Sequence, residues 1–164
     1  MKKIAKDEIE ELLTIIPRDY PSLDIFYLCA DCLGVCEELD RLCHKEGYEF
    51  DLAITDESVL NGLDIKARKF DFSRSRYNQH SKMYDFVFVS IDLKEVENID
   101  LFYKKLYAIS KNAGKVIFIT SLDKNLRELE EVLIEKNYVA VNPILDTFTN
   151  FQILSAQKMH GWGN

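Results

Sequence analysis

The spacing of hydrophobic residues changes repeatedly between the period of a helix and that of a strand. Apolar side chains recur at helical intervals from Ile9 until Pro17, which predicts an amphipathic helix over 6–16. A second apolar helical face begins at Val35, and Gly47 suits the cap that ends its helix. The same spacing predicts a brief helix at 57–62 and longer helices at 99–110 and 124–136.

Short apolar runs separate these helices and predict strands. The clearest run, 84–91, is apolar throughout its middle, as in a parallel strand that helices cover on both faces. Asn112-Ala113-Gly114 is expected to lead from the helix at 99–110 into a strand at 116–120. The remaining predicted strands are 23–28, 52–55, 66–70, 138–141 and 148–156.

The order of these elements predicts the fold class. Strands and helices alternate, and only the last two strands are joined without a helix. Because parallel neighbours need a crossover connection, this order indicates an α/β, three-layer, doubly wound and mostly parallel sheet with a C-terminal antiparallel hairpin. We expect a single domain over 1–164, in which 1–21 form a helical lead-in.

Composition and charge narrow the class of protein. The chain has 164 residues, 21 basic against 28 acidic, and its net charge of −7 does not attract nucleic acid or anionic membranes as a whole. No apolar run approaches the ~20 residues of a membrane span, and the N-terminus lacks the apolar core of a signal peptide. All four cysteines lie between Cys29 and Cys43, too close together in sequence for disulfides that would stabilise a secreted domain. We therefore expect a cytoplasmic protein with no membrane contact.

Four segments then resemble one family, the class I S-adenosylmethionine-dependent methyltransferases. The run 84–89 is similar to that family's fourth strand, and 99–106 to its next helix. Residues 111–119 are similar to its glycine-containing passage into the fifth strand, without the proline and with one glycine. Residues 129–138 resemble the helix and turn that enter its hairpin. The resemblance implies the seven-stranded sheet of that family and S-adenosylmethionine as cofactor.

The family's glycine-x-glycine-x-glycine turn is degenerate here. Ala30, Cys32 and Gly34 occupy the three glycine places, so all three residues are small but only one is glycine. In the family this turn lets the cofactor approach bare backbone. A shifted register would place Asp24 at the family's preceding acid, but Phe26 and Leu28 would then fill glycine places. We prefer the first register.

Three acids follow predicted strands. By resemblance, Asp56 stands where the family binds both ribose hydroxyls of the cofactor, a task that suits a carboxylate because it accepts two hydrogen bonds at once. Asp71 stands where the family often has an acid facing the adenine amino group, and Asp92 lies near the place of methyl transfer. Each acid could instead cap a helix or turn.

The cysteines permit a metal site but favour a structural role. Cys29 and Cys32 have the spacing of a zinc knuckle, yet no second knuckle exists in the sequence. If the helix begins early, all four cysteines share one helical face, and cysteine is among the residue types most often buried. We interpret them as core residues and expect no metal.

One segment carries charge opposite to that of the whole chain. Residues 66–82 are basic with interleaved aromatic side chains, so Arg74, Arg76 and Tyr77 could bind an anionic substrate or a nucleic acid. A solvated loop over the sheet edge is the interpretation that we favour.

Two functions remain open from the sequence. The first is a methyltransferase whose substrate the sequence does not identify. The second is a binding or scaffold protein that kept the fold without cofactor affinity and could contact an anionic partner through 66–82. Because small chains of this fold often pair, a homodimer is expected.

Overall fold

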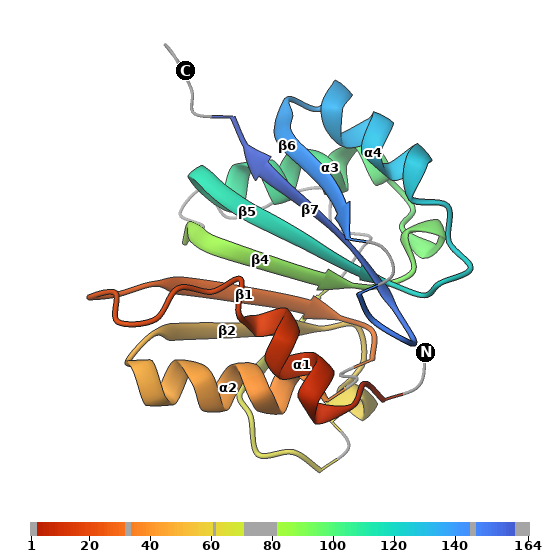
Figure 1. Cartoon of the computed structure of the whole chain (residues 1–164). Coiled ribbons are helices and arrows are strands. Elements are labelled where there is room, and N and C mark those ends of the chain that lie inside the picture. The colour runs from red at the N-terminus through yellow and green to blue at the C-terminus, as the bar shows by residue number, and fades with distance from the viewer. Residues whose placement is uncertain (1–2, 32–33, 61, 71–81, 145–146, 160–164) are drawn as a thin grey trace.

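The computed structural model describes residues 3–31, 34–60, 62–70, 82–144 and 147–159. In these residues seven strands form one sheet, with helices on both faces (Figure 1). The strands are β1 (Asp24–Cys29), β2 (Glu49–Ile54), β3 (Ala67–Lys69), β4 (Tyr84–Ser90), β5 (Ser110–Thr120), β6 (Tyr138–Ile144) and β7 (Gln152–Lys158). The helices are α1 (Lys6–Leu13), α2 (Val35–Glu46), α3 (Ile99–Ile109) and α4 (Leu126–Glu135), with short 3₁₀ turns η1 (Glu57–Leu60) and η2 (Leu93–Glu95).

The strand order is β3-β2-β1-β4-β5-β7-β6. Strands β1 to β5 pair in parallel, and β7 runs antiparallel to both β5 and β6. The predicted doubly wound sheet with a C-terminal antiparallel hairpin is therefore confirmed. None of the helices in the described residues combines the length and apolar character that crossing a membrane requires.

Apolar groups cover both faces of the central strands. On β1, Ile25 and Tyr27 point into one core with α1 and α2, whereas Phe26 and Leu28 point into a second core with α3 and α4. Figure 1 shows these two pairs of helices on opposite sides of the sheet. The alternation follows from the two-residue period of a strand, and it explains why the run at 84–91 is apolar throughout.

Strand β5 is longer than the sequence predicts. It begins at Ser110, directly after α3, and includes Asn112-Ala113-Gly114 as an irregularity between the pairs Tyr84↔Ser110 and Phe86↔Lys115. Strand β7 conversely begins at Gln152 rather than near 148, because 147–150 form bends. Hydrophobic spacing does not locate these boundaries, because residues 110–114 are polar or small and the apolar Phe148 lies in a bend rather than in a strand.

Three cysteines lie in the described residues, and all three are buried. Cys29 belongs to β1, whereas Cys36 and Cys43 belong to α2, so the cysteines do not share one helical face as expected. The Sγ atoms of Cys29 and Cys36 lie 3.8 Å apart in the core. Burial raises the pKa of Cys43 to about 12, which keeps its thiol protonated. No group of three potential metal-ligating side chains occurs in this described part, and Cys32 lies outside it.

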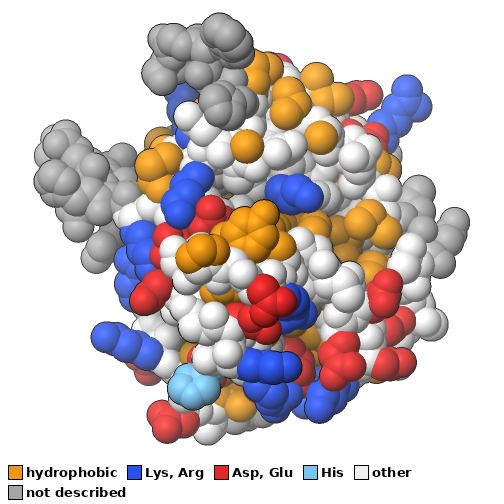
Figure 2. Space-filling model, turned by 60° about the vertical axis from the view of Figure 1, so that its left-hand side comes forward, with side chains coloured by type: hydrophobic (Ala, Val, Ile, Leu, Met, Phe, Trp, Pro, Cys, Tyr) orange, Lys and Arg blue, Asp and Glu red, His pale blue; other side chains and the backbone are white. Residues whose placement is uncertain are grey.

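Ion pairs join the amino ends of the central strands. Lys111 Nζ donates to Asp24 Oδ2 and to Asp85 Oδ2, each at 3.0 Å, and Lys82 Nζ lies 3.3 Å from Asp24 Oδ1. Burial raises the pKa of Asp24, but hydrogen bonds from the two lysines outweigh it and leave the pKa below its usual value. Figure 2 brings the side of these amino ends forward and shows basic and acidic side chains intermixed there.

Gly114 gives a direct test of the close approach between β4 and β5. A Cβ atom at Gly114 would lie 2.8 Å from the backbone oxygen of Lys111 and 3.0 Å from that of Tyr84. Gly114→Ala should therefore lower the free energy of unfolding by about 1–3 kcal/mol, as overpacking usually does, in urea denaturation. The neighbouring Ala113 has a φ of +64°, so Ala113→Gly relieves strain and should change stability by less than about 1 kcal/mol. Equal stability of Gly114→Ala and the natural chain would contradict this packing.

Candidate functional site

The carboxyl ends of β1 and β4 meet at the point where the strand order reverses. The chain places β2 on one side of β1 and then returns to place β4 and β5 on the other. Ala30 N donates to Ser90 O at 3.0 Å, and the hydroxyls of Tyr27 and Ser90 share a buried hydrogen bond of 2.5 Å. Ligands of open parallel sheets bind in the crevice at such a reversal. These bonds hold both of its walls in register.

A cavity of about 820 Å³ opens at this edge of the sheet, within the range typical of ligand sites. Ala30 and Asp31 line it from the end of β1, and residues 90–94 line it from the end of β4. Its other wall consists of Ile119 and Thr120 at the end of β5, Ser121 and residues 123–125 after it, and side chains of α3 and α4. The cavity therefore extends from the strand reversal towards β5 and α4.

Side-chain hydrogen bonds fix the loops around the cavity. Asp92 Oδ1 accepts from Lys94 N at 3.1 Å and caps η2. Across the cavity, the buried Gln152 of β7 donates through Nε2 to Ser121 O at 2.9 Å and to Lys124 O at 2.7 Å. The backbone on one side of the cavity is thus held by Asp92, which lines the cavity, and on the other side by Gln152, which does not.

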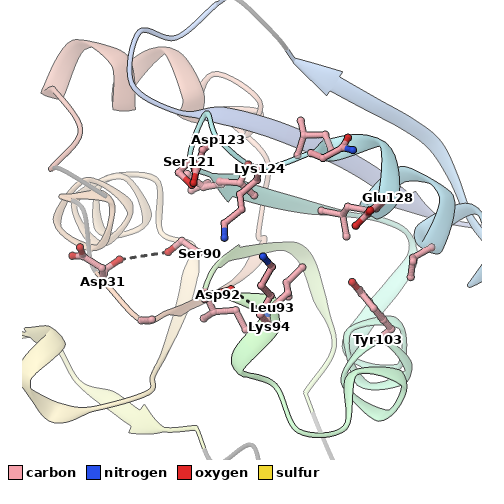
Figure 3. Close-up of a pocket in the computed structure, with 18 residues that line it drawn as sticks. Asp31, Ser90, Asp92, Leu93, Lys94, Tyr103, Ser121, Asp123, Lys124 and Glu128 are labelled. Atoms are coloured by element: carbon pink, nitrogen blue, oxygen red, sulfur yellow. Dashed lines mark hydrogen bonds between the residues drawn. The ribbon is translucent and has the colours of Figure 1, made fainter.

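The cavity wall is rich in charged side chains. Figure 3 shows Lys94 and Lys124 pointing into the cavity towards one another, and Asp31 and Glu128 towards its opposite ends. A hydrogen bond from Ser121 lowers the pKa of Asp123 most, and the positive charges of Lys124 and Lys94 lower it further. Burial, with the negative charge of Asp100 adding, raises the pKa of Tyr103 to about 12, so its hydroxyl keeps the proton.

Asp56 lies on the other side of β1, just beyond β2, and does not line the cavity. Its side chain is exposed, and Oδ1 accepts from Ser58 N at 2.8 Å at the start of η1. Hydrogen bonds from Ser58 lower the pKa of Asp56, so the carboxylate is charged at neutral pH. Asp56 therefore caps the start of η1 through Oδ1, as the alternative interpretation predicted. The carboxylate has a second accepting oxygen at the carboxyl end of β2.

Gly34 begins α2 with a φ of +85°, a conformation that favours glycine. A Cβ atom there would lie 3.1 Å from Lys3 Cε and 3.2 Å from Ile9 Cδ1. The missing side chain therefore makes room for the N-terminal segment.

The structure brings part of the predicted site together. Ala30 and Asp92 line one cavity, whereas Gly34 and Asp56 lie outside its lining. Five predicted site residues lie outside the described residues, namely Cys32, Asp71, Arg74, Arg76 and Tyr77. The sequence reading missed the loop 121–125 and Tyr103. The loop could have been found, because it follows a predicted parallel strand and the carboxyl ends of such strands meet at one edge.

Solved structures with the same arrangement of elements are methyltransferases. An S-adenosylmethionine-dependent O-methyltransferase from Thermotoga maritima matches with a TM-score of 0.72 and 10% identity, over 100% of this chain and 69% of its own. An S-adenosylmethionine-dependent methyltransferase from Aquifex aeolicus matches with a TM-score of 0.69 and 12% identity, over 92% of this chain and 89% of its own. This chain has the class I methyltransferase fold.

The methyltransferase fold occurs here without a detectable match in sequence. No protein-family model and no curated protein sequence matches the chain. The CMeT domain structure of the citrinin polyketide synthase aligns with a TM-score of 0.71 and 11% identity, over 93% of this chain. The chain spans about half, 51%, of that structure's length. Likeness at this level of identity establishes the fold, and the chemistry has to be argued from the residues.

Proposed function

We propose that the chain is an S-adenosylmethionine-dependent methyltransferase. Its cofactor would lie across the carboxyl ends of β1 and β2, and its acceptor substrate would enter the cavity between β4 and β5. The observation that carries the proposal is the position of the cavity, which begins at the strand reversal between β1 and β4. That position is where ligands of doubly wound sheets bind.

The described residues at this edge fit the cofactor. Asp56 offers a charged, exposed carboxylate beyond β2, as hydrogen bonding to a ribose requires. Ala30 is small and exposed at the end of β1, so it leaves the backbone open to a ligand. Gly34 fits the cofactor less well, because Lys3 and Ile9 occupy the space beside it that a glycine leaves open.

When bound, the cofactor would supply a methyl group on a positively charged sulfur. An acceptor would attack the methyl carbon in line with the sulfur, which leaves as neutral S-adenosylhomocysteine. The contribution of this chain would be position. The bonds between Ala30 and Ser90 and between Tyr27 and Ser90 fix the two strand ends that face both ligands. Tyr103, which keeps its proton, would donate a hydrogen bond into the cavity.

A binding or scaffold protein of the same fold is the second candidate. Two observations favour it: only one of the three glycine places holds a glycine, and Lys3 and Ile9 cover the open side of Gly34. In this case the cavity would serve recognition without a cofactor. Cofactor binding therefore separates the two candidates.

Calorimetric titration of the purified chain with S-adenosylmethionine and S-adenosylhomocysteine tests the proposal. We expect both ligands to bind with dissociation constants below about 1 mM, corresponding to about −4 kcal/mol or better. Absence of heat and of any rise in unfolding temperature at millimolar concentrations of both ligands would contradict the methyltransferase and favour the scaffold.

Asp56→Asn separates a ribose contact from a turn cap. Asparagine caps about as well as aspartate, so folding stability should change by less than about 0.5 kcal/mol. The amide has one accepting oxygen and no charge, so affinity for S-adenosylhomocysteine should fall about tenfold, the equivalent of about 1.4 kcal/mol.

Glu57→Gln is the matched control for this titration, since Glu57 is the neighbouring exposed acid. Its affinity for S-adenosylhomocysteine should equal that of the natural chain. An equal affinity for Asp56→Asn as well would reduce Asp56 to its capping role.

A further inference from the structure

Two lysines converge on the cavity from different loops. Lys94 follows β4 in η2, and Lys124 lies in the turn between β5 and α4. Figure 3 shows the two side chains pointing towards one another inside the cavity. Neither lysine forms an ion pair within the part of the chain that the structure describes. Two ammonium groups that point towards one another repel, so an anion bound between them is electrostatically favourable.

The backbone of each lysine is held in place. Lys94 N donates to Asp92 Oδ1 at 3.1 Å. Lys124 N donates to Ser121 O at 3.2 Å, and Lys124 O accepts from Gln152 Nε2 at 2.7 Å. The direction in which the lysine side chains leave the loops is therefore fixed by the fold. Such preorganisation reduces the cost of ordering a binding site.

Two acids that neighbour these lysines in the sequence already accept hydrogen bonds. Asp92 caps η2 through Oδ1, and Asp123 accepts a hydrogen bond from the Ser121 hydroxyl. Asp123 lies within the field of both lysines, as the lowering of its pKa by each of them indicates. One carboxylate thus faces two ammonium groups. In Figure 3 the other acids of the wall, Asp31 and Glu128, lie towards the two ends of the cavity.

We infer that Lys94 and Lys124 bind an anionic group of the acceptor substrate, a phosphate or a carboxylate. Ammonium groups form short, charge-assisted hydrogen bonds with such oxygens. The inference rests on the proposed function in calling the ligand an acceptor. The acceptor is favoured over the cofactor because both lysines come from the loops after β4 and β5, on the side of β1 opposite to Asp56.

Titration with two simple anions tests the inference. Inorganic phosphate and succinate are added separately to the ¹⁵N-labelled chain at constant ionic strength, and amide resonances are followed by NMR. We expect saturable shifts at 92–94 and 121–125 with either anion. The anion that binds with the lower dissociation constant indicates whether the acceptor carries a phosphate or a carboxylate.

The double variant Lys94→Gln with Lys124→Gln should weaken the tighter anion at least tenfold. The matched control, Lys6→Gln with Lys45→Gln, removes two exposed lysines outside the cavity and should leave its affinity unchanged. Thermal unfolding of both double variants shows whether each is folded. Absence of shifts at the two loops, or equal weakening in both double variants, would overturn the inference.

A final titration distinguishes an acceptor site from the cofactor site. The anion titration is repeated with saturating S-adenosylhomocysteine, and the anion should still bind. Loss of anion binding under that condition would assign the lysines to the cofactor's own carboxylate and overturn the inference. If S-adenosylhomocysteine does not bind at all, the proposed function fails, whereas the anion site is still judged by the double variants.

Discussion

Strands β1 and β4 lie side by side in the centre of the sheet, and both of their faces are covered by apolar groups. Ile25 and Phe86 belong to the core under α1 and α2, and Phe26 and Val87 to the core under α3 and α4. Burial of apolar surface on both faces requires helices on both faces, which in turn requires crossover connections and parallel neighbours. The same pairing brings the carboxyl ends of β1 and β4 together, so the position of the cavity follows from the way the core is packed.

Charged side chains are arranged differently at the amino ends and at the carboxyl ends of the strands. At the amino ends, Lys111 bridges Asp24 and Asp85, and the carboxylates have cations beside them. At the carboxyl ends, Lys94 and Lys124 point into a cavity without ion pairs to the described carboxylates. Ion pairs balance the charges at the amino ends, whereas the cations at the carboxyl ends are suited to a ligand that supplies an anion. This contrast supports placing function at the carboxyl edge.

Hydrophobic spacing predicts the fold because periodic burial on both faces leaves a signal in every central strand. It fails at β5, whose start at Ser110 depends on a polar bulge, and at Cys29, which belongs to a strand rather than to the helix face. The site is predicted in part. Ala30 and Asp92 follow strands and are found by position, as the loop 121–125 could have been. The hydrogen bond from the distant Gln152 that holds Lys124 in this loop is revealed by no local pattern.

We propose that the carboxyl edge of this sheet binds S-adenosylmethionine beside an acceptor cavity. A crystal structure of the chain grown with S-adenosylhomocysteine tests it most directly. We expect the adenosine to lie across the ends of β1 and β2 with its ribose on Asp56, and the cavity between Lys94 and Lys124 to remain free for a second ligand. Binding of S-adenosylhomocysteine at another surface, or between the two lysines, would contradict it.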